Sequence, residues 1–286
     1  MNNMRDKIQI FEVDIDTLTR EDALKRVGEF LKGNGEHYVV TPNPEIVLAA
    51  QKDENFRNIL NNASLAMPDG FGLLCAAWFL GLPRLHRMTG VDLMLEICRI
   101  ASAQGKSVFL LGARRGVGEK AAKVLQAKFP ELKIAGVEWG GEIQLLEVKP
   151  PKIGHSEAQP KNLPRMRVRP CERDPSPPLA AQDDIVKRIN AAAPDVLFVA
   201  LGHPKQEKWI AAHLKQLPSV KVAMGVGGAF DYIAGITPRA PAWMRSIGLE
   251  WLYRMFYEPW RIRRILNAVI LFPWMVIRKK IWSASA

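Results

Sequence analysis

Polar and charged residues stand directly after several apolar strands that the sequence predicts. Thr41, Asn43 and Asp69 follow two of these strands, and Lys205 and Gln206 follow a third at the start of a helix. A helix N-terminus carries free N–H groups and a positive dipole end, so Lys205 and Gln206 suit an anionic ligand. A carboxylate such as Asp69 can take a proton from a reacting group. The pattern indicates a site that binds an anion beside an acid–base group.

Each of these positions also has a purely structural interpretation. Asp69 lies in Pro68-Asp69-Gly70, where an aspartate can cap the next helix. Thr41 and Asn43 lie in Thr41-Pro42-Asn43-Pro44, whose two prolines fix an extended loop in which both side chains can serve as hydrogen-bonding caps. The spacing alone leaves both interpretations open.

Glycine-rich turns follow the remaining predicted strands. Gly202 begins the turn before Lys205, and Gly227 and Gly228 lead to Asp231, which can accept hydrogen bonds from a base or a ribose. Gly112 opens a strand–turn–helix segment that resembles a dinucleotide loop but lacks the Gly-x-Gly-x-x-Gly spacing. We expect Gly112 to lie on the nucleotide side of the site, and tight turns are the alternative explanation for all of these glycines.

The candidate site residues follow strands and precede helices, and this arrangement predicts an α/β fold. The run 196–201 is apolar without alternation, which predicts a strand covered on both faces at the centre of a parallel sheet. The sequence therefore predicts a Rossmann-like, mostly parallel sheet with helices on both faces. Strands are expected at 8–15, 37–40, 63–67, 107–111, 132–137, 196–201 and 220–226. Helices are expected at 19–31, 45–52, 71–80, from about 92 to 103, from after Gly118 to 129, and at 182–192.

Composition narrows the class of protein. The chain has 286 residues, 48% of them hydrophobic, and a formal net charge of +11. This charge favours a nucleic acid, an anionic membrane surface or a phosphorylated ligand as partner. Three cysteines without metal-ligand spacing suggest neither disulfides nor a zinc site, and no signal peptide or spanning segment is evident. We expect a protein of the reducing cytoplasm.

The last fifty residues differ in kind. Residues 237–286 carry nine Lys and Arg against two Glu, and five of the eight tryptophans. The run 265–277 is apolar except for Asn267 and is interrupted by Pro273, so it is too short to span a bilayer. Cations beside tryptophans favour a helical appendage in the membrane interface. A nucleic-acid patch or a plain packing helix is the alternative, and the long aliphatic run speaks against nucleic acid.

The predicted domain organisation has two parts and an insert. Residues 1–236 form the catalytic α/β domain, and residues 237–286 form the appendage. Residues 142–178 contain eight prolines and no hydrophobic periodicity, which indicates a flexible insert with little part in the core.

Taken together, the loops resemble the WecG/TagA/CpsF glycosyltransferases, family 26. The likeness runs from about residue 8 to 265, excluding the insert. It rests on six motifs in matching order: Thr41-Pro42-Asn43-Pro44-Glu45, Pro68-Asp69-Gly70, Arg87-Met88-Thr89-Gly90-Val91-Asp92-Leu93, Gly202 to Trp209, Gly225 to Asp231, and Arg239 to Met244 continuing through Gly248 to Arg254.

The resemblance implies an inverting, metal-independent transfer of a sugar from a UDP-sugar to a polyprenyl-diphosphate-linked saccharide. It implies no cofactor, since the UDP-sugar is a substrate, and a place on the inner face of the cytoplasmic membrane. N-acetylmannosamine, its uronic acid, glucose and glucuronic acid are all plausible donor sugars, and the oligomeric state is open.

The resemblance also assigns roles to individual residues. It makes Asp69 the candidate base, and it places Thr41, Asn43 and Gln206 on the donor sugar and diphosphate. Arg87 would help to place substrate, and Asp231 would contact the nucleoside. In the tail, Arg254, Arg261 and Arg264 are the candidates for the diphosphate.

Two other functions compete with this interpretation. The parallel sheet and the Gly112 loop would suit an NAD-dependent oxidoreductase, although Gly-x-Gly-x-x-Gly and a Tyr-x-x-x-Lys pair are absent. A non-catalytic nucleotide-binding adaptor on membranes would share the loops and the basic tail.

Overall fold

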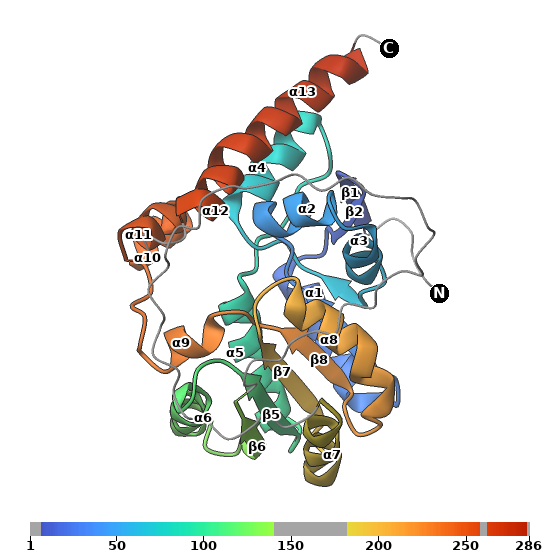
Figure 1. Cartoon of the computed structure of the whole chain (residues 1–286), viewed down its shortest axis with the longest axis vertical. Helices are drawn as coiled ribbons and strands as arrows, with labels where there is room; N and C mark the ends of the chain where they lie inside the picture. Colours follow the sequence, from blue (N-terminus) through green and yellow to red (C-terminus); the bar gives the residue numbers. More distant parts are fainter. Residues whose placement is uncertain (1–6, 140–181, 258–261, 285–286) are drawn as a thin grey trace, which may run out of the picture.

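The structure is a computed structural model that describes residues 7–139, 182–257 and 262–284 (Figure 1). The predicted insert at 142–178 and Arg261 lie outside the described residues. The division of the chain at residue 236 stays a prediction.

Eight strands and the helices around them account for most of the described chain. The strands are β1 Lys7–Ile10, β2 Val13–Asp16, β3 His37–Val40, β4 Leu65–Ala66, β5 Ser107–Gly112, β6 Lys133–Glu138, β7 Val196–Ala200 and β8 Val222–Gly225. The helices of the first part are α1 Arg20–Lys32, α2 Pro44–Ala50, α3 Glu54–Asn61, α4 Phe71–Leu80, α5 Gly90–Ala103, α6 Val117–Lys128, α7 Gln182–Ala192, α8 Lys205–His213 and α9 Ala229–Ile233. Those of the tail are α10 Ala242–Ser246, α11 Glu250–Tyr257, α12 Ile262–Leu266 and α13 Phe272–Ala284.

Six strands form one parallel sheet in the order β4-β3-β8-β7-β5-β6, which confirms the predicted fold class. Successive residues of β7 point to opposite faces of the sheet. Val196 and Phe198 pack in the core under α1, α5 and α6, whereas Leu197 and Val199 pack in the core under α7 and α8. Both faces are covered by helices, and this explains why β7 has no polar residue.

The N-terminal segment differs from the expected single strand. β1 and β2 form a separate antiparallel hairpin, pairing Ile8 with Ile15. Its two turn residues, Phe11 and Glu12, have positive φ angles of 51° and 60°, as a tight two-residue hairpin turn requires. These residue types rarely adopt that conformation, so the sequence carries no turn signal there. The prediction of one strand over 8–15 is therefore wrong.

A second difference lies between Lys52 and Ala63, where helix α3 was not expected. Asp53 caps it by accepting a hydrogen bond from the Phe56 N–H at 2.9 Å. Buried Phe56 and Leu60 anchor α3 in the same core as the β1–β2 hairpin.

The tail packs against the first part of the chain. Phe272 and Val276 of α13 are buried in one core with residues of α2 and α4, and α13 lies alongside α4 (Figure 1). Pro273 is the second residue of α13. The π-helical turn Asn267–Leu271 precedes it, and a wider turn accommodates a residue that cannot donate a backbone hydrogen bond. None of the described helices is long and apolar enough to cross a membrane.

Candidate active site

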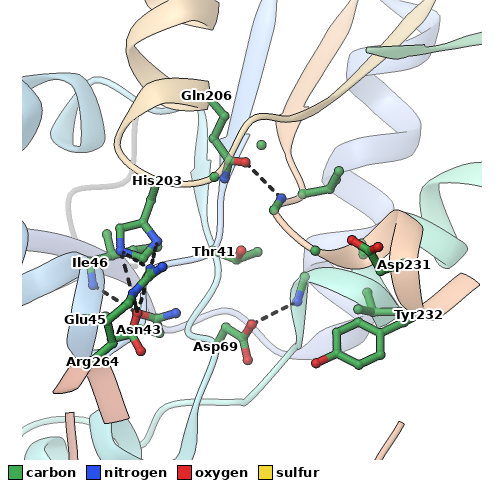
Figure 2. Close-up of a pocket in the computed structure, with 18 of the residues that line it drawn as sticks. Thr41, Asn43, Glu45, Ile46, Asp69, His203, Gln206, Asp231, Tyr232 and Arg264 are labelled. Carbon is green, nitrogen blue, oxygen red and sulfur yellow. Dashed lines mark hydrogen bonds and ion pairs between the residues drawn. The ribbon is translucent and has the colours of Figure 1, made fainter. Parts of the chain in front are cut away.

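A polar cavity lies at the carboxyl edge of the sheet, where the loops after β3, β4, β7 and β8 meet (Figure 2). This is the edge at which parallel sheets bind ligands. Most of the residues predicted for the site line this cavity: Thr41, Asn43, Asp69, Gly202, Gln206, Gly227, Gly228, Asp231 and Arg264.

Asp69 is held by the backbone on two sides. Its N–H donates to the Pro42 carbonyl at 2.7 Å, and its Oδ2 accepts from the Gly90 N–H at 3.2 Å. These bonds join the loop after β4 to the loop after β3 and to the start of α5. The carboxylate is therefore fixed at the edge of the cavity beside the Thr41 loop (Figure 2).

Asn43 has the structural role that the sequence left open, and it also lines the cavity. Its Oδ1 accepts from the Ile46 N–H at 2.9 Å and so caps α2, with Pro44 as the first helical residue. The amide NH₂ group of Asn43 is not used by this cap. It can still donate to a ligand in the cavity.

Gln206 is more deeply buried than the sequence suggests, with 5% of its surface exposed. Its Oε1 accepts from the Gly227 N–H at 2.9 Å, and its Nε2 donates to Glu207 Oε1 at 2.8 Å. Sequence reasoning missed Glu207, which is 3% exposed. Burial raises the pKa of Glu207 to about 7. The burial of this carboxyl group beside Gln206 is what marks Glu207 as a candidate site residue, and burial cannot be seen in the sequence alone.

Asp231 faces the cavity and pairs with Arg114, at 2.8 Å between Oδ1 and Nη2. Arg114 belongs to the loop that Gly112 opens, and sequence reasoning assigned it no role. Gly112 itself does not line the cavity. A Cβ there would lie 2.7 Å from the Ala200 carbonyl oxygen, and its φ is +103°, so close packing between β5 and β7 explains this glycine. Within the described residues, the ion pair of Arg114 with Asp231 joins the Gly112 loop to the site.

The tail contributes Arg264 to the mouth of the cavity. Its guanidinium Nη2 lies 2.9 Å from Glu45 Oε2 and within hydrogen-bonding distance of the His203 ring (Figure 2). Arg254 lies in α11, but its side chain is outside the description, as is the whole of Arg261. Lys205 is exposed at the first residue of α8 and does not line the cavity.

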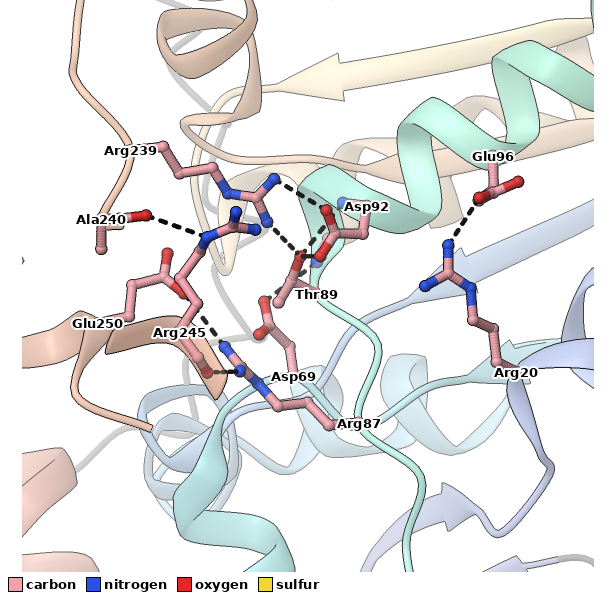
Figure 3. Close-up of polar contacts among 11 residues, drawn as sticks. Arg20, Asp69, Arg87, Thr89, Asp92, Glu96, Arg239, Ala240, Arg245 and Glu250 are labelled. Carbon is pink, nitrogen blue, oxygen red and sulfur yellow. Dashed lines mark hydrogen bonds and ion pairs between the residues drawn. The ribbon is translucent and has the colours of Figure 1, made fainter. Parts of the chain in front are cut away.

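Arg87 does not face the polar cavity. It donates to the Arg245 carbonyl at 2.7 Å and to Glu250 Oε2 at 3.1 Å (Figure 3). Arg239 binds Asp92 and Thr89 at 2.8 and 3.0 Å in the same region. Residues of the tail are thus tied to the segment between Asp69 and α5.

An apolar groove adjoins the polar cavity. It runs between α4 and the tail helices α11 to α13, and its lining includes Phe71, Trp78, Phe79, Trp251, Phe272 and Val276. Asn43, Glu45 and Asp69 line both the groove and the cavity. Asp69 therefore stands where a polar space meets an apolar one, and a reaction there could join a water-soluble substrate to an apolar one.

The chain is similar to a known protein family and to individual proteins of known name. Residues 8–147 and 156–286 match the family described as "Glycosyl transferase WecG/TagA/CpsF family". A relative from Staphylococcus aureus (strain MRSA252) is 33% identical over 276 residues, which cover 96% of this chain and 93% of the relative. A second, from Staphylococcus aureus (strain NCTC 8325 / PS 47), is 32% identical with the same coverage. Both are named N-acetylglucosaminyldiphosphoundecaprenol N-acetyl-beta-D-mannosaminyltransferase. The match continues beyond residue 265, where the resemblance was expected to end.

Proposed function

Because the chain belongs to the WecG/TagA/CpsF family of glycosyltransferases, we propose that it transfers an N-acetylmannosamine-type sugar from a UDP-sugar to a saccharide carried on a polyprenyl diphosphate. The names of the relatives support this acceptor and this sugar among the four that the resemblance left open. The product would serve bacterial cell-envelope or exopolysaccharide synthesis. Family membership argues against the NAD-dependent oxidoreductase.

The position of Asp69 carries the proposal. Its carboxylate borders the polar cavity, which suits a nucleotide sugar, and the apolar groove, which suits a prenyl chain. A transferase of this kind must bring these two unlike substrates to one point. Asp69 is the acidic group of the predicted set that lines both spaces.

In the proposed reaction, Asp69 takes the proton of the acceptor hydroxyl group. The hydroxyl oxygen forms a bond to the anomeric carbon of the donor sugar from the face opposite the diphosphate. The bond from that carbon to the diphosphate oxygen breaks, and UDP leaves with the bonding electrons. Attack from the opposite face inverts the configuration at the anomeric carbon.

The remaining cavity residues would bind the donor. Thr41, the Asn43 amide and Gln206 would contact its sugar and diphosphate, and the Gly227–Gly228 backbone and Asp231 would contact the nucleoside. Arg264 would stabilise the negative charge of the departing diphosphate, the role that a metal ion has in other transferases. We therefore propose a reaction that needs neither a metal nor a cofactor. Arg254 and Arg261 stay candidates for the same role.

We further propose that the protein is peripheral on the inner face of the cytoplasmic membrane. Three tryptophans are strongly exposed on the paired helices α4 and α13: Trp78, Trp274 and Trp282. The Arg278 guanidinium lies 5.6 Å from the rings of Trp274 and Trp282. Aromatic rings at headgroup depth beside cations are suited to an anionic bilayer. The groove between these helices would then open toward the lipid.

Product analysis tests the proposed function. The protein is incubated with radiolabelled UDP-N-acetylmannosamine and N-acetylglucosaminyl-diphosphoundecaprenol in detergent or in anionic vesicles, with and without EDTA. We expect a lipid-linked disaccharide in both cases, with a product linkage inverted relative to the donor by ¹H NMR. UDP binding without transfer, across a panel of UDP-sugars, would instead indicate the non-catalytic adaptor.

A further inference from the structure

The side-chain amide of Gln206 is held in one orientation by two hydrogen bonds. Its Oε1 accepts from the Gly227 N–H at 2.9 Å (Figure 2), and its Nε2 donates to Glu207 Oε1 at 2.8 Å. Both side chains are almost fully buried. Hydrogen bonds in such surroundings are costly to break because water cannot replace them.

Gly225 leaves the room that this arrangement needs. A Cβ on Gly225 would lie 2.7 Å from Gln206 Nε2 and 2.9 Å from its Cδ. The Gln206 side chain therefore lies directly against the end of β8. From there its oxygen reaches the turn that begins at Gly227 and leads to Asp231.

Glu207 and the Gly227 N–H together fix the orientation of the Gln206 amide. If the amide were turned over, its NH₂ group would face the Gly227 N–H, donor against donor, and its oxygen would face the Glu207 carboxyl group. Glu207 Oε1 can accept from Gln206 whether or not the carboxyl group is ionised. A proton on Glu207 would sit on Oε2, which has no hydrogen-bond partner among the described residues.

We propose that Glu207 is a positioning residue of the donor site, acting through Gln206. It holds the amide so that the oxygen fixes the Gly227 turn and one hydrogen of Nε2 is left for an oxygen of the donor. Gln206 thereby presents a hydrogen-bond donor, and not an acceptor, to the nucleotide sugar. The identity of the ligand in this role rests on the proposed function. The link from Glu207 through Gln206 to Gly227 rests on the two hydrogen bonds alone.

Substitutions at Glu207 separate positioning from simple packing. Glu207→Leu keeps the volume and removes the acceptor, and Glu207→Asp withdraws it by one methylene group. Glu207→Gln keeps an oxygen that can accept from Gln206. Lys208→Met is the matched control, because it removes the ion pair of α8 with Asp53, 2.6 Å long, without touching Gln206.

Two readouts are made on each variant. The first is hydrogen exchange of the Gly227 amide, which requires no substrate. We expect about tenfold faster exchange in Glu207→Leu, a smaller increase in Glu207→Asp, and no change in Glu207→Gln or Lys208→Met. The second is steady-state transfer, where KM for the UDP-sugar should rise about tenfold in Glu207→Leu with KM for the lipid acceptor unchanged. Glu207→Gln should restore the donor KM to within about threefold of the wild-type value.

Several results would overturn the proposal. Unchanged Gly227 exchange in Glu207→Leu, or in Glu207→Asp should the leucine variant not fold, would remove the link. A loss in Glu207→Gln as large as in Glu207→Leu, or the same loss in Lys208→Met, would reduce Glu207 to a packing residue. If the wild-type protein transfers no sugar, the proposed function fails, and Gly227 exchange still decides the link from Glu207.

Discussion

Arg87 and Glu250 form an ion pair, 3.1 Å between Nη2 and Oε2, that joins the segment before α5 to α11 across 163 positions of the sequence. Both side chains are mostly buried. The pair lies beside Asp69 (Figure 3). The guanidinium of Arg87 binds the tail, and Arg87 also lines the apolar groove, so its contact with substrate stays a prediction.

The first prediction concerns this pair. Arg87→Met and Glu250→Gln should each lower the free energy of unfolding by about 1 to 3 kcal/mol, because each removes a charged hydrogen bond from a partly buried site. In the double variant the losses should not add, leaving a coupling energy of about 1 kcal/mol in urea unfolding. Additive losses would show that the two residues act independently.

Much of the fold could be predicted because its signals are local. The strand at 37–40 and the helices at 71–80 and 182–192 have the predicted bounds. In each of them an apolar pattern is bounded by polar, glycine or proline residues, and such signals lie within a few positions of the element.

The remaining parts depend on contacts that a local pattern does not contain. Arg87 and Glu250, or Arg114 and Asp231, meet only after the chain has folded, and nothing near Arg114 distinguishes it from Arg115. The hairpin turn at Phe11 and the π-helical turn before Pro273 are uncommon backbone conformations that no local residue pattern predicts. Apart from Arg264, which comes from the tail, the predicted cavity residues follow strands of one parallel sheet, and these strand ends share an edge.

The second prediction uses Cys75 as a reporter of the apolar groove. Cys75 is exposed and lines the groove, whereas Cys98 is buried. In a Cys171→Ser background, a maleimide should modify Cys75, and the lipid-linked acceptor should slow the reaction at least fivefold. UDP alone should not, because Cys75 does not line the polar cavity. Equal labelling rates with and without the acceptor, measured by mass spectrometry, would argue against this groove as the lipid site.

The third prediction concerns the tail arginine that reaches the cavity. Arg264→Met should lower kcat by roughly 100-fold, because the charge that develops on the departing diphosphate loses a cation. Arg278→Met is the control. Its guanidinium lies over tryptophan rings of α13, so it should weaken vesicle binding and leave turnover of a detergent-solubilised acceptor unchanged. A normal kcat in Arg264→Met would take this residue out of the mechanism.

The fourth prediction is a pH dependence of stability. Burial raises the pKa of Glu207 from 4.5 to about 7, so the folded protein keeps this proton at pH values where the unfolded chain has lost it. Glu207 therefore makes the free energy of unfolding fall as the pH rises from about 4.5 to about 7, with no further change above. Relative to the wild-type protein, Glu207→Gln should gain roughly 2 kcal/mol between pH 5 and pH 8. Urea unfolding at the two pH values measures this gain, and parallel pH profiles would contradict it.

The fifth prediction tests the junction between the polar cavity and the apolar groove. In Asp69→Asn the side chain keeps its shape and can no longer take the acceptor proton, so transfer from UDP-N-acetylmannosamine to the lipid-linked acceptor should fall at least 100-fold. UDP binding by calorimetry and acceptor protection of Cys75 should both match the wild-type protein. Full transfer activity in Asp69→Asn would contradict the account.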